Sequence, residues 1–279
     1  MEVVKSVEEL RKVIDFQKKN NVSIGFVPTM GALHEGHISL VEKAGKESGF
    51  VVVSIFVNPT QFNNKEDLER YPRDLDSDIK MLEKTRCRLV FVPDVDEMYP
   101  EPDTRIFDFG QLGNVMEGKF RPGHFNGVAQ IVSKLFDVVT PDKAFFGMKD
   151  FQQLAIINKM VKMLNYNITI IPCPIVREPD GLAMSSRNML LNKEERSNAA
   201  VISRTLFAAV DLAGIRTVEE VRKWVIATID KNPFLNTEYF EIVDFNDLTP
   251  IKNWTANVNK IGCIAVHCGK VRLIDNIIF

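Results

Sequence analysis

The chain has 279 residues, of which 45% are hydrophobic and 26% charged, and its formal net charge is −2. These values are typical of a soluble globular protein, and they exclude the strongly basic surface of a nucleic-acid-binding protein, so we expect no nucleic-acid partner. The longest apolar runs are too short to cross a bilayer, so we expect no membrane contact either.

The cysteines and the first residues of the chain predict its compartment. No two of the four cysteines form a CxxC pair; they are Cys87, Cys173, Cys263 and Cys268. Residues 1–13 are charged and lack the apolar segment of a secretory leader. We therefore expect free thiols and a cytoplasmic protein.

Apolar runs alternate with helical patterns in the first part of the chain. The predicted strands there are 22–27, 50–57, 88–92, 143–146 and 167–171, with one short strand near 105–109. The predicted helices are 37–46, 75–84, 126–138 and 151–164. Strands separated by helices of this length are typical of βαβ units, so the sequence predicts an α/β fold with a parallel sheet.

The pattern changes after about residue 176. Two predicted helices, 193–213 and 218–231, precede three short strands, 238–245, 262–267 and 271–275. The last two strands are separated by "CGK", which is typical of a tight turn. We therefore predict two domains, an α/β domain at 1–175 and a smaller α+β domain at 176–279.

The segment "TMGALHEGH" follows the first predicted strand and leads into a helix. Gly31 and Gly36 permit tight turns, and the N–H groups of a helix N-terminus accept phosphate. The helix dipole supplies only about 0.3–1 kcal/mol per exposed charge, so we expect His34 and His37 to add side-chain donors. Two alternatives stay open. One is a zinc site, although the spacing differs from HExxH, and the other is a pair of incidental surface histidines.

The segment "FVNPTQF" lies at the carboxyl end of the second strand, where ligands bind in open α/β sheets. The neutral amides of Asn58 and Gln61 could hold a hydroxyl or a carboxylate, or Gln61 could lie in solvent after an Asn-Pro turn. The charged segment that follows, residues 63–78, is predicted to be a solvated face rather than a metal cluster.

Three further segments carry polar side chains next to predicted helices or loops. "RPGHFNGV" combines Arg121 and His124 with a helix start, although a Pro-Gly turn explains it equally well. "FFGMKDFQQL" places Lys149 where it could meet a phosphate and makes Asp150 a helix cap or a magnesium ligand. The alternative for this segment is a capped helix start with a solvated lysine.

The third of them, the loop "GLAMSSRN" at residues 181–188, contains two serines and an arginine after a glycine. Arg187 gives a forked donor and the serines give short hydrogen bonds, so the loop can wrap a polyphosphate. Ser-Ser-Arg is also common in linkers, but junction loops between domains often close over ligands.

Together these segments resemble the pantothenate synthetase (pantoate–β-alanine ligase) family. "FVPTMGALHEGH", "VVVSIFVNPTQF", "RYPRDLDSD", "RPGHFNGV", "FFGMKDFQQL", "IVREPDGLAMSSRN" and the terminal "RLIDN" occur in the family's order along nearly all the chain. The pair His34 and His37 resembles the HIGH signature of nucleotidyltransferases, and residues 184–187 resemble its KMSKS partner loop. The resemblance implies a Rossmann-like N-terminal domain and a C-terminal domain that covers the active site.

The resemblance also implies a reaction in two steps. The pantoate carboxylate attacks the α-phosphorus of MgATP, which gives pantoyl adenylate and pyrophosphate. The amine of β-alanine then attacks the acyl carbon, which gives pantothenate and AMP. The implied partners are ATP, Mg²⁺, pantoate, β-alanine and a second copy of the chain in a homodimer.

The family's site residues carry over to matching positions of this chain. The implied catalytic residues are His34, His37, Lys149 and Arg187. The implied ATP-binding residues are Met30, Gly31, Ala32, Leu33, His34, Glu35, Gly36, His37, Gly147, Met148, Lys149, Asp150, Val176, Met184, Ser185, Ser186 and Arg187. Pantoate would bind Gln61, Gln153, Val128, Ile131 and Val132, and β-alanine would bind Gln61, Arg121 and His124. Asp150 is the implied magnesium ligand, for which the acids at 74–78 compete.

Three other functions remain to be separated from this one. A different nucleotidyltransferase would share the histidine loop but would keep the nucleotide in its product. A zinc hydrolase would use His34 and His37 as ligands. A non-catalytic nucleotide-binding module would bind ATP without turnover, but it gives no reason for the two glutamines and the second basic loop.

Overall fold

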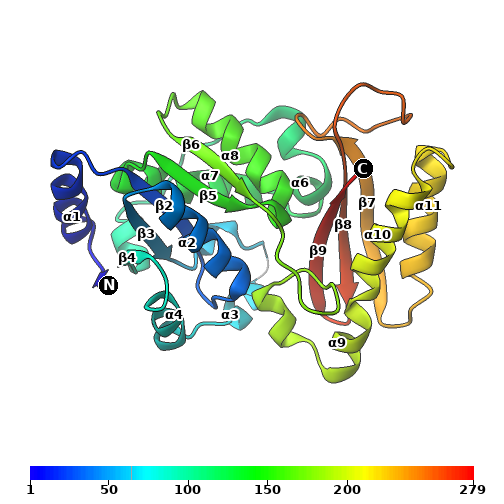
Figure 1. Cartoon of the computed structure of the whole chain (residues 1–279), viewed down its shortest axis with the longest axis horizontal. Helices are drawn as coiled ribbons and strands as arrows, with labels where there is room; N and C mark the ends of the chain where they lie inside the picture. The colour runs from blue at the N-terminus through cyan, green and yellow to red at the C-terminus, as the bar shows by residue number, and fades with distance from the viewer. Residues whose placement is uncertain (64) are drawn as a thin grey trace.

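The computed structural model describes residues 1–63 and 65–279 and contains two sheets (Figure 1). The larger sheet is six-stranded and its pairs are parallel, in the order β1-β4-β3-β2-β5-β6. Its strands are β1 (Glu2–Val4), β2 (Ile24–Thr29), β3 (Phe50–Ile55), β4 (Cys87–Phe91), β5 (Lys143–Gly147) and β6 (Thr169–Cys173). The predicted parallel α/β fold is confirmed, with β1 as an additional strand.

Helices cover both faces of this sheet. The main ones are α1 (Val7–Lys19), α2 (Glu35–Glu47), α4 (Leu75–Leu82), α7 (His124–Val139) and α8 (Phe151–Met163). Phe26 and Val52 share an apolar cluster with α1, α7 and α8, whereas Val27 and Val53 share one with α2 and α4. Successive strand residues point to opposite faces, so these central strands need apolar residues at every position.

Two short helices, α3 (Lys65–Arg70) and α5 (Val95–Met98), lie in the connections around β4, and α6 (Met116–Phe120) precedes α7. The strand predicted near 105–109 is wrong, because residues 102–109 form no helix or strand. Side chains of α7 bond to this backbone instead. Asn126 Oδ1 accepts from the Phe107 N–H at 2.8 Å, and Gln130 Nε2 donates to the Arg105 carbonyl at 2.8 Å.

The smaller sheet is antiparallel and three-stranded, in the order β7-β8-β9. Its strands are β7 (Leu235–Asp244), β8 (Lys260–Cys268) and β9 (Val271–Ile278), preceded by α9 (Lys193–Ala199), α10 (Val201–Leu212) and α11 (Val218–Ile229). The single helix predicted at 193–213 is wrong, because α9 and α10 meet at a corner where Ala199 and Ala200 are fully buried. The predicted turn is present at Gly269, whose φ is +57°.

The smaller sheet packs on both of its faces. One face shares an apolar cluster with α10 and α11. Tyr239 and Cys263 pack in a separate cluster with Met116 and Phe151 of the N-terminal part, so the two sheets sit side by side with α6 and α8 between them (Figure 1). None of the helices that the structure describes is long and apolar enough to cross a membrane.

Candidate active site

A cavity of about 200 Å³ lies at the carboxyl ends of the central parallel strands. Its walls include Thr29 at the end of β2, Phe56 just after β3, Gly147 at the end of β5 and Pro174 just after β6. Ligands of open α/β sheets bind in this position. Segments that lie far apart in the sequence therefore meet where the fold favours a binding site.

The loop between β2 and α2 is held in a strained conformation. Gly31 and Ala32 have φ angles of +78° and +49°, in the left-handed region that is unfavourable for alanine. The carboxylate of Asp78 in α4 accepts hydrogen bonds from the N–H groups of Ala32 and Leu33, at 2.9 and 2.7 Å. Asp78 thus stabilises the backbone that leads directly to His34.

The predicted solvated face at residues 63–78 is therefore wrong at Asp78, which is only 2% exposed. Burial raises the pKa of Asp78, while the two backbone hydrogen bonds oppose that shift. Tyr71 in the same segment is also buried. Asn64, which belongs to that predicted face, lies outside the described residues.

His34 and His37 stand at the start of α2 with ring centroids 4.1 Å apart. Nδ1 of His34 accepts from the Gly36 N–H at 3.1 Å, and Nδ1 of His37 accepts from the His34 N–H at 3.3 Å. Because each Nδ1 is an acceptor, the proton of each neutral ring is on Nε2. Both side chains line the cavity and can donate from Nε2.

Both imidazoles are neutral at pH 7. Burial lowers the pKa of His34 to about 4, and the charge of Lys149 acts in the same direction. Burial also lowers the pKa of His37 to about 3, with smaller contributions from His34 and Lys149.

The start of α2 differs in one respect from the predicted phosphate site. The Gly36 N–H is bonded to the His34 ring, and the His37 N–H is bonded to the His34 carbonyl at 2.8 Å. A side chain at Gly36 would also collide with the His34 ring. The imidazole N–H groups, rather than these backbone groups, are therefore the donors available to a phosphate.

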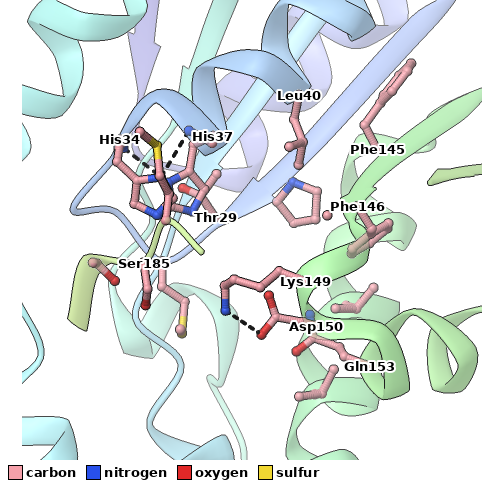
Figure 2. Close-up of a pocket in the computed structure, with 18 of the residues that line it drawn as sticks. Thr29, His34, His37, Leu40, Phe145, Phe146, Lys149, Asp150, Gln153 and Ser185 are labelled. Atoms are coloured by element: carbon pink, nitrogen blue, oxygen red, sulfur yellow. Dashed lines mark hydrogen bonds and ion pairs between the residues drawn. The ribbon is translucent and has the colours of Figure 1, made fainter. Parts of the chain in front are cut away.

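A cation and a carboxylate lie across the cavity from the histidines. Figure 2 shows Lys149, Asp150 and Gln153 on this side, and all three line the cavity. They come from the 3₁₀ turn η3 (Met148–Asp150) and the first turn of α8. Lys149 Nζ is 3.4 Å from Asp150 Oδ1, and the lysine side chain is the more buried of the two, at 19% against 44% exposed.

Amide side chains after β3 form a fixed polar corner. Asn58, which is 1% exposed, donates to Gln61 Oε1 at 3.3 Å and to the Gly127 carbonyl at 3.1 Å, and it accepts from the Tyr99 hydroxyl at 2.8 Å. A Cβ at Gly127 would lie 2.4 Å from the Thr60 carbonyl oxygen. Glycine therefore lets α7 approach the backbone that carries Gln61.

The junction loop closes the cavity from a third side. Ser185 precedes the 3₁₀ turn η4 (Ser186–Leu190), and Ser186 Oγ lies 3.2 Å from the Tyr71 hydroxyl. The Arg187 guanidinium lies over the Tyr71 ring, 5.7 Å from its centroid, and Arg187 Nη2 is 3.0 Å from Asp67 Oδ2. The loop is thus tied to the segment between β3 and β4.

One wall of the cavity is apolar. Val128, Ile131 and Val132 of α7 line it together with Phe56 and Leu135, and all five are buried. The four of these residues that belong to α7 are spaced so that they lie on one face of the helix. This wall lies next to the amide corner of Asn58 and Gln61.

A second cavity, of about 40 Å³, adjoins the first, because Lys149, Asp150 and Gln153 line both. Arg121 and His124 line this second cavity and not the first. Arg121 donates to His124 Nε2 at 3.1 Å, so His124 donates from Nδ1 to the Gln61 carbonyl at 2.8 Å. Burial, helped by the charge of Arg121, lowers the pKa of His124 to about 4.

Glu117 anchors the far side of the second cavity. Arg272 donates to both of its carboxylate oxygens, at 2.6 and 2.8 Å, and Tyr239 donates to it at 2.8 Å. Although burial opposes ionisation, these contacts lower the pKa of Glu117 to about 2. A buried carboxylate with such partners stays charged and fixed.

Most of the predicted site residues line the larger cavity. These are Met30, His34, Gly36, His37, Gln61, Val128, Ile131, Val132, Gly147, Lys149, Asp150, Gln153, Val176, Met184, Ser185, Ser186 and Arg187. Gly31, Ala32, Leu33, Glu35 and Met148 do not line it. The N–H groups of Ala32 and Leu33 face Asp78, Glu35 is exposed, and Met148 packs against apolar residues.

Within the described residues, no group of three or more His, Cys, Asp or Glu side chains could hold a metal ion. The zinc alternative therefore lacks a third ligand beside His34 and His37. Asp74 and Asp78 are committed to backbone N–H groups, since Asp74 accepts from Ser77 at 3.0 Å. Asp150, by contrast, lines the cavity and is partly exposed.

Sequence reasoning considered Asp78 only as one of the competing magnesium ligands, and it did not find Asp78 or Tyr71 as residues that shape the site. Asp78 stands in a run of charged residues, but helical spacing puts it on the same face as Leu75 and Leu82, which was the available signal. Tyr71 could have been found, because an aromatic residue in a polar run indicates a buried contact.

A family model and the similar curated proteins all describe the same kind of enzyme. A family model described as pantoate-beta-alanine ligase matches residues 2–278. A pantothenate synthetase of Bacteroides thetaiotaomicron is 54% identical over 277 residues, covering 99% of this chain and 98% of that protein. A pantothenate synthetase of Caldicellulosiruptor saccharolyticus is 46% identical over 280 residues, covering 100% of this chain and 99% of that protein.

Two solved structures are similar over nearly the whole chain. Pantothenate synthetase from Thermus thermophilus has a TM-score of 0.93 at 43% identity, covering 99% of both chains. A pantoate-beta-alanine ligase from Francisella tularensis, solved in complex with beta-gamma ATP and beta-alanine, has a TM-score of 0.83 at 35% identity. It covers 100% of this chain and 97% of that one.

Proposed function

The chain belongs to the pantoate–β-alanine ligase family, and we propose that its larger cavity is where ATP activates the pantoate carboxylate. The enzyme joins pantoate to β-alanine in an ATP-dependent reaction that gives pantothenate, AMP and pyrophosphate. The observation that carries the site assignment is the pair of neutral imidazoles facing Lys149 across this cavity.

In the first step an oxygen of the pantoate carboxylate bonds to the α-phosphorus of ATP. The bond from that phosphorus to the oxygen of the leaving pyrophosphate breaks, which leaves pantoyl adenylate. No proton is transferred, so the site needs fixed donors rather than an acid. The Nε2–H groups of His34 and His37 and the charge of Lys149 supply such donors.

The junction loop adds further donors for the phosphates. Ser185, Ser186 and Arg187 line the same cavity, and Arg187 stands between Tyr71 and Asp67 at its edge. We infer that the bound triphosphate displaces Asp67 from the Arg187 guanidinium, because both the triphosphate and the Asp67 carboxylate are anions. Met30, Gly147, Val176 and Met184 then contribute the remaining wall around the nucleotide.

Pantoate carries a carboxylate, hydroxyl groups and a gem-dimethyl group, and the cavity has a matching surface for each. Gln61 and Gln153 offer neutral amides for the hydroxyl and carboxylate groups. Val128, Ile131 and Val132 form an apolar surface against which the two methyl groups can pack. Burying apolar surface on that wall is worth roughly 0.8 kcal/mol per CH₂ group.

Asp150 fits a magnesium ion bound mainly by the nucleotide. Mg²⁺ in nucleotide sites usually keeps several waters and takes one or two carboxylates besides phosphate oxygens. Asp150 is a partly exposed carboxylate at the wall of the cavity. The ion would neutralise charge on the phosphates.

The second cavity is the proposed site for β-alanine. Arg121 offers donors for its carboxylate, while His124, whose one N–H is held by the Gln61 carbonyl, orients Arg121, and Gln61 lies on the path to the first cavity. The neutral amine nitrogen of β-alanine attacks the acyl carbon of pantoyl adenylate, and the carbon–oxygen bond to AMP breaks. The nitrogen then loses a proton to water.

Three further proposals concern the whole protein. The chain divides near residue 175, so that residues 1–175 hold nucleotide and pantoate and residues 176–279 cover the active site. The protein works as a homodimer, as the family resemblance implies. It acts in the cytoplasm, where free thiols persist, and its four cysteines are unpaired and buried.

The direct test incubates the protein with ATP, Mg²⁺, pantoate and β-alanine and identifies the products by mass spectrometry. AMP and pantothenate must appear in equal amounts. A nucleotide retained in the product would indicate a different nucleotidyltransferase instead. Lys149→Ala is the matched control, because it removes a cation from the larger cavity and should form little of either product.

A further inference from the structure

The terminal motif "RLIDN" has no role in the chemistry described so far, although it forms most of strand β9. Arg272, Ile274 and Asn276 alternate along this strand and so point to one face of the sheet. Arg272 bonds to Glu117, and Ile274 and Asn276 line the second cavity. This face of β9 therefore meets the N-terminal half of the molecule at the site.

Asn276 is hydrogen-bonded to the backbone of the loop that carries Lys149. Its side-chain nitrogen donates to the Met148 carbonyl at 2.8 Å and to the Lys149 carbonyl at 3.1 Å. Asn276 is only 4% exposed, so water competes little for these bonds. The backbone of η3 is thereby fixed by a residue that comes more than a hundred positions later in the chain.

Asp275 extends the same connection to the junction loop. Its Oδ1 accepts from the Asn276 N–H at 2.8 Å and from Arg177 at 3.0 Å, and its Oδ2 accepts from Arg177 at 2.7 Å. Arg177 also donates to the Gly181 carbonyl at 3.1 Å. The neighbouring backbone is paired too, because the Met184 N–H bonds to the Val176 carbonyl at 3.0 Å.

We propose that Asn276 is a positioning residue for adenylation: it fixes the η3 backbone so that Lys149 stands opposite His34 and His37. Asp275 orients Asn276 and ties the same strand to the loop that carries Ser185 and Arg187. The C-terminal sheet thus does more than cover the site, because it sets the geometry of both phosphate-binding loops. The proposal rests on the proposed role of Lys149 in phosphate binding.

The chemistry gives this role a distinct kinetic consequence. Lys149 stabilises charge on the phosphates while pyrophosphate leaves, and the second step releases no pyrophosphate. Displacement of a catalytic group by about 1 Å can lower a rate by about 10²-fold. Asn276 also lines the proposed β-alanine cavity, so its substitution should slow the first half-reaction and spare the second when β-alanine is saturating.

The test measures both half-reactions in Asn276→Asp and Asn276→Ala. The first substitution replaces the donor by an anion of the same shape, and the second removes the donor without adding charge. We expect pantoate-dependent exchange of pyrophosphate into ATP to fall about 10- to 100-fold. At saturating β-alanine, the reaction of supplied pantoyl adenylate should change less than about threefold.

A double variant separates positioning from a general loss of structure. In Lys149→Ala, adding Asn276→Ala should lower exchange by less than about threefold, because residues that act as a unit are not additive. Asn232→Asp is the control, since Asn232 donates at 2.8 Å to Asn198 within the C-terminal part alone. This control should exchange pyrophosphate normally.

Two results would overturn the inference by itself, and a third would overturn it together with the proposed role of Lys149. One is normal exchange in both Asn276 variants while Lys149→Ala is slow. The other is a full, additive loss in the double variant. If Lys149→Ala itself exchanges pyrophosphate at the normal rate, the proposed role of Lys149 fails first, and the inference fails with it. If Asn276→Asp does not fold, the alanine variant carries the test.

Discussion

Two loops at neighbouring strand ends face each other across the cavity, and they are held in different ways. The loop after β2 carries His34 and His37, and it is fixed from within its own half of the molecule by Asp78 and by its own imidazoles. The loop after β5 carries Lys149, and it is held from the other sheet by Asn276.

This difference separates what is preformed from what depends on contact between the two sheets. The imidazole side combines strained backbone with a buried carboxylate, and these contacts all lie within the N-terminal part of the chain. On the lysine side, Asn276 of β9 fixes the backbone that carries Lys149. Catalysis by positioned donors therefore requires both parts of the chain: one holds the histidine loop and the other holds the lysine loop.

The largest expected effect comes from removing a donor on the preformed side. His37→Ala should slow pantoate-dependent pyrophosphate exchange by about 10²–10³-fold, the loss typical of one fixed transition-state donor. His267→Ala is the matched control, because His267 is only partly buried and lines neither cavity. A loss smaller than threefold in His37→Ala would mean that the imidazole does not serve adenylation.

The next effect comes from releasing the strained loop. Asp78→Ala leaves the Ala32 and Leu33 N–H groups without their acceptor, and we expect exchange to slow about 10- to 100-fold because His34 and His37 shift. Asp78→Asn keeps one acceptor oxygen and should lose less. Asp76→Ala in the same helix is exposed and should behave as wild type. Equal rates for Asp78→Ala and Asp76→Ala would contradict the account.

The sequence predicts the fold around the two loops better than it predicts the contacts that hold them. Strand and helix periodicity predicts the parallel sheet and the order of the segments that meet at its edge, because local pattern determines local structure. Helical spacing puts Asp78, and not Asp76, on the face of Leu75 and Leu82, but it does not predict that the Asp78 carboxylate binds the N–H groups of a loop more than forty residues earlier. It also cannot assign Asn276 to Lys149, because that contact depends on how two distant sheets pack.

The imidazole on the second cavity predicts a pH effect on stability. The pKa of His124 is lowered to about 4, so the unfolded state binds more protons than the folded state between about pH 4 and 6.5. Stability should therefore fall as pH drops through that window, by about 2 kcal/mol for this group between pH 7.5 and 5.

Chemical denaturation at pH 7.5 and 5 checks this prediction in wild type and His124→Gln. The variant should lose about 2 kcal/mol less than wild type over this interval. Identical pH dependence in His124→Gln and wild type would show that folding does not lower the pKa of His124.

The smallest expected effect concerns the apolar wall. Val132→Thr keeps the shape of the side chain and adds a hydroxyl next to the proposed gem-dimethyl position, which should raise the KM for pantoate about three- to tenfold. The KM for ATP should change less than twofold. Val138→Thr makes the same change on α7 outside the cavity. If ATP and pantoate respond equally, the wall does not select pantoate.

The central claim is that the two loops together activate a carboxylate with ATP before the amine takes part. Exchange of labelled pyrophosphate into ATP, measured without β-alanine, tests this most directly. The account predicts exchange that requires both pantoate and Mg²⁺. A folded protein that shows no exchange until β-alanine is added would contradict it.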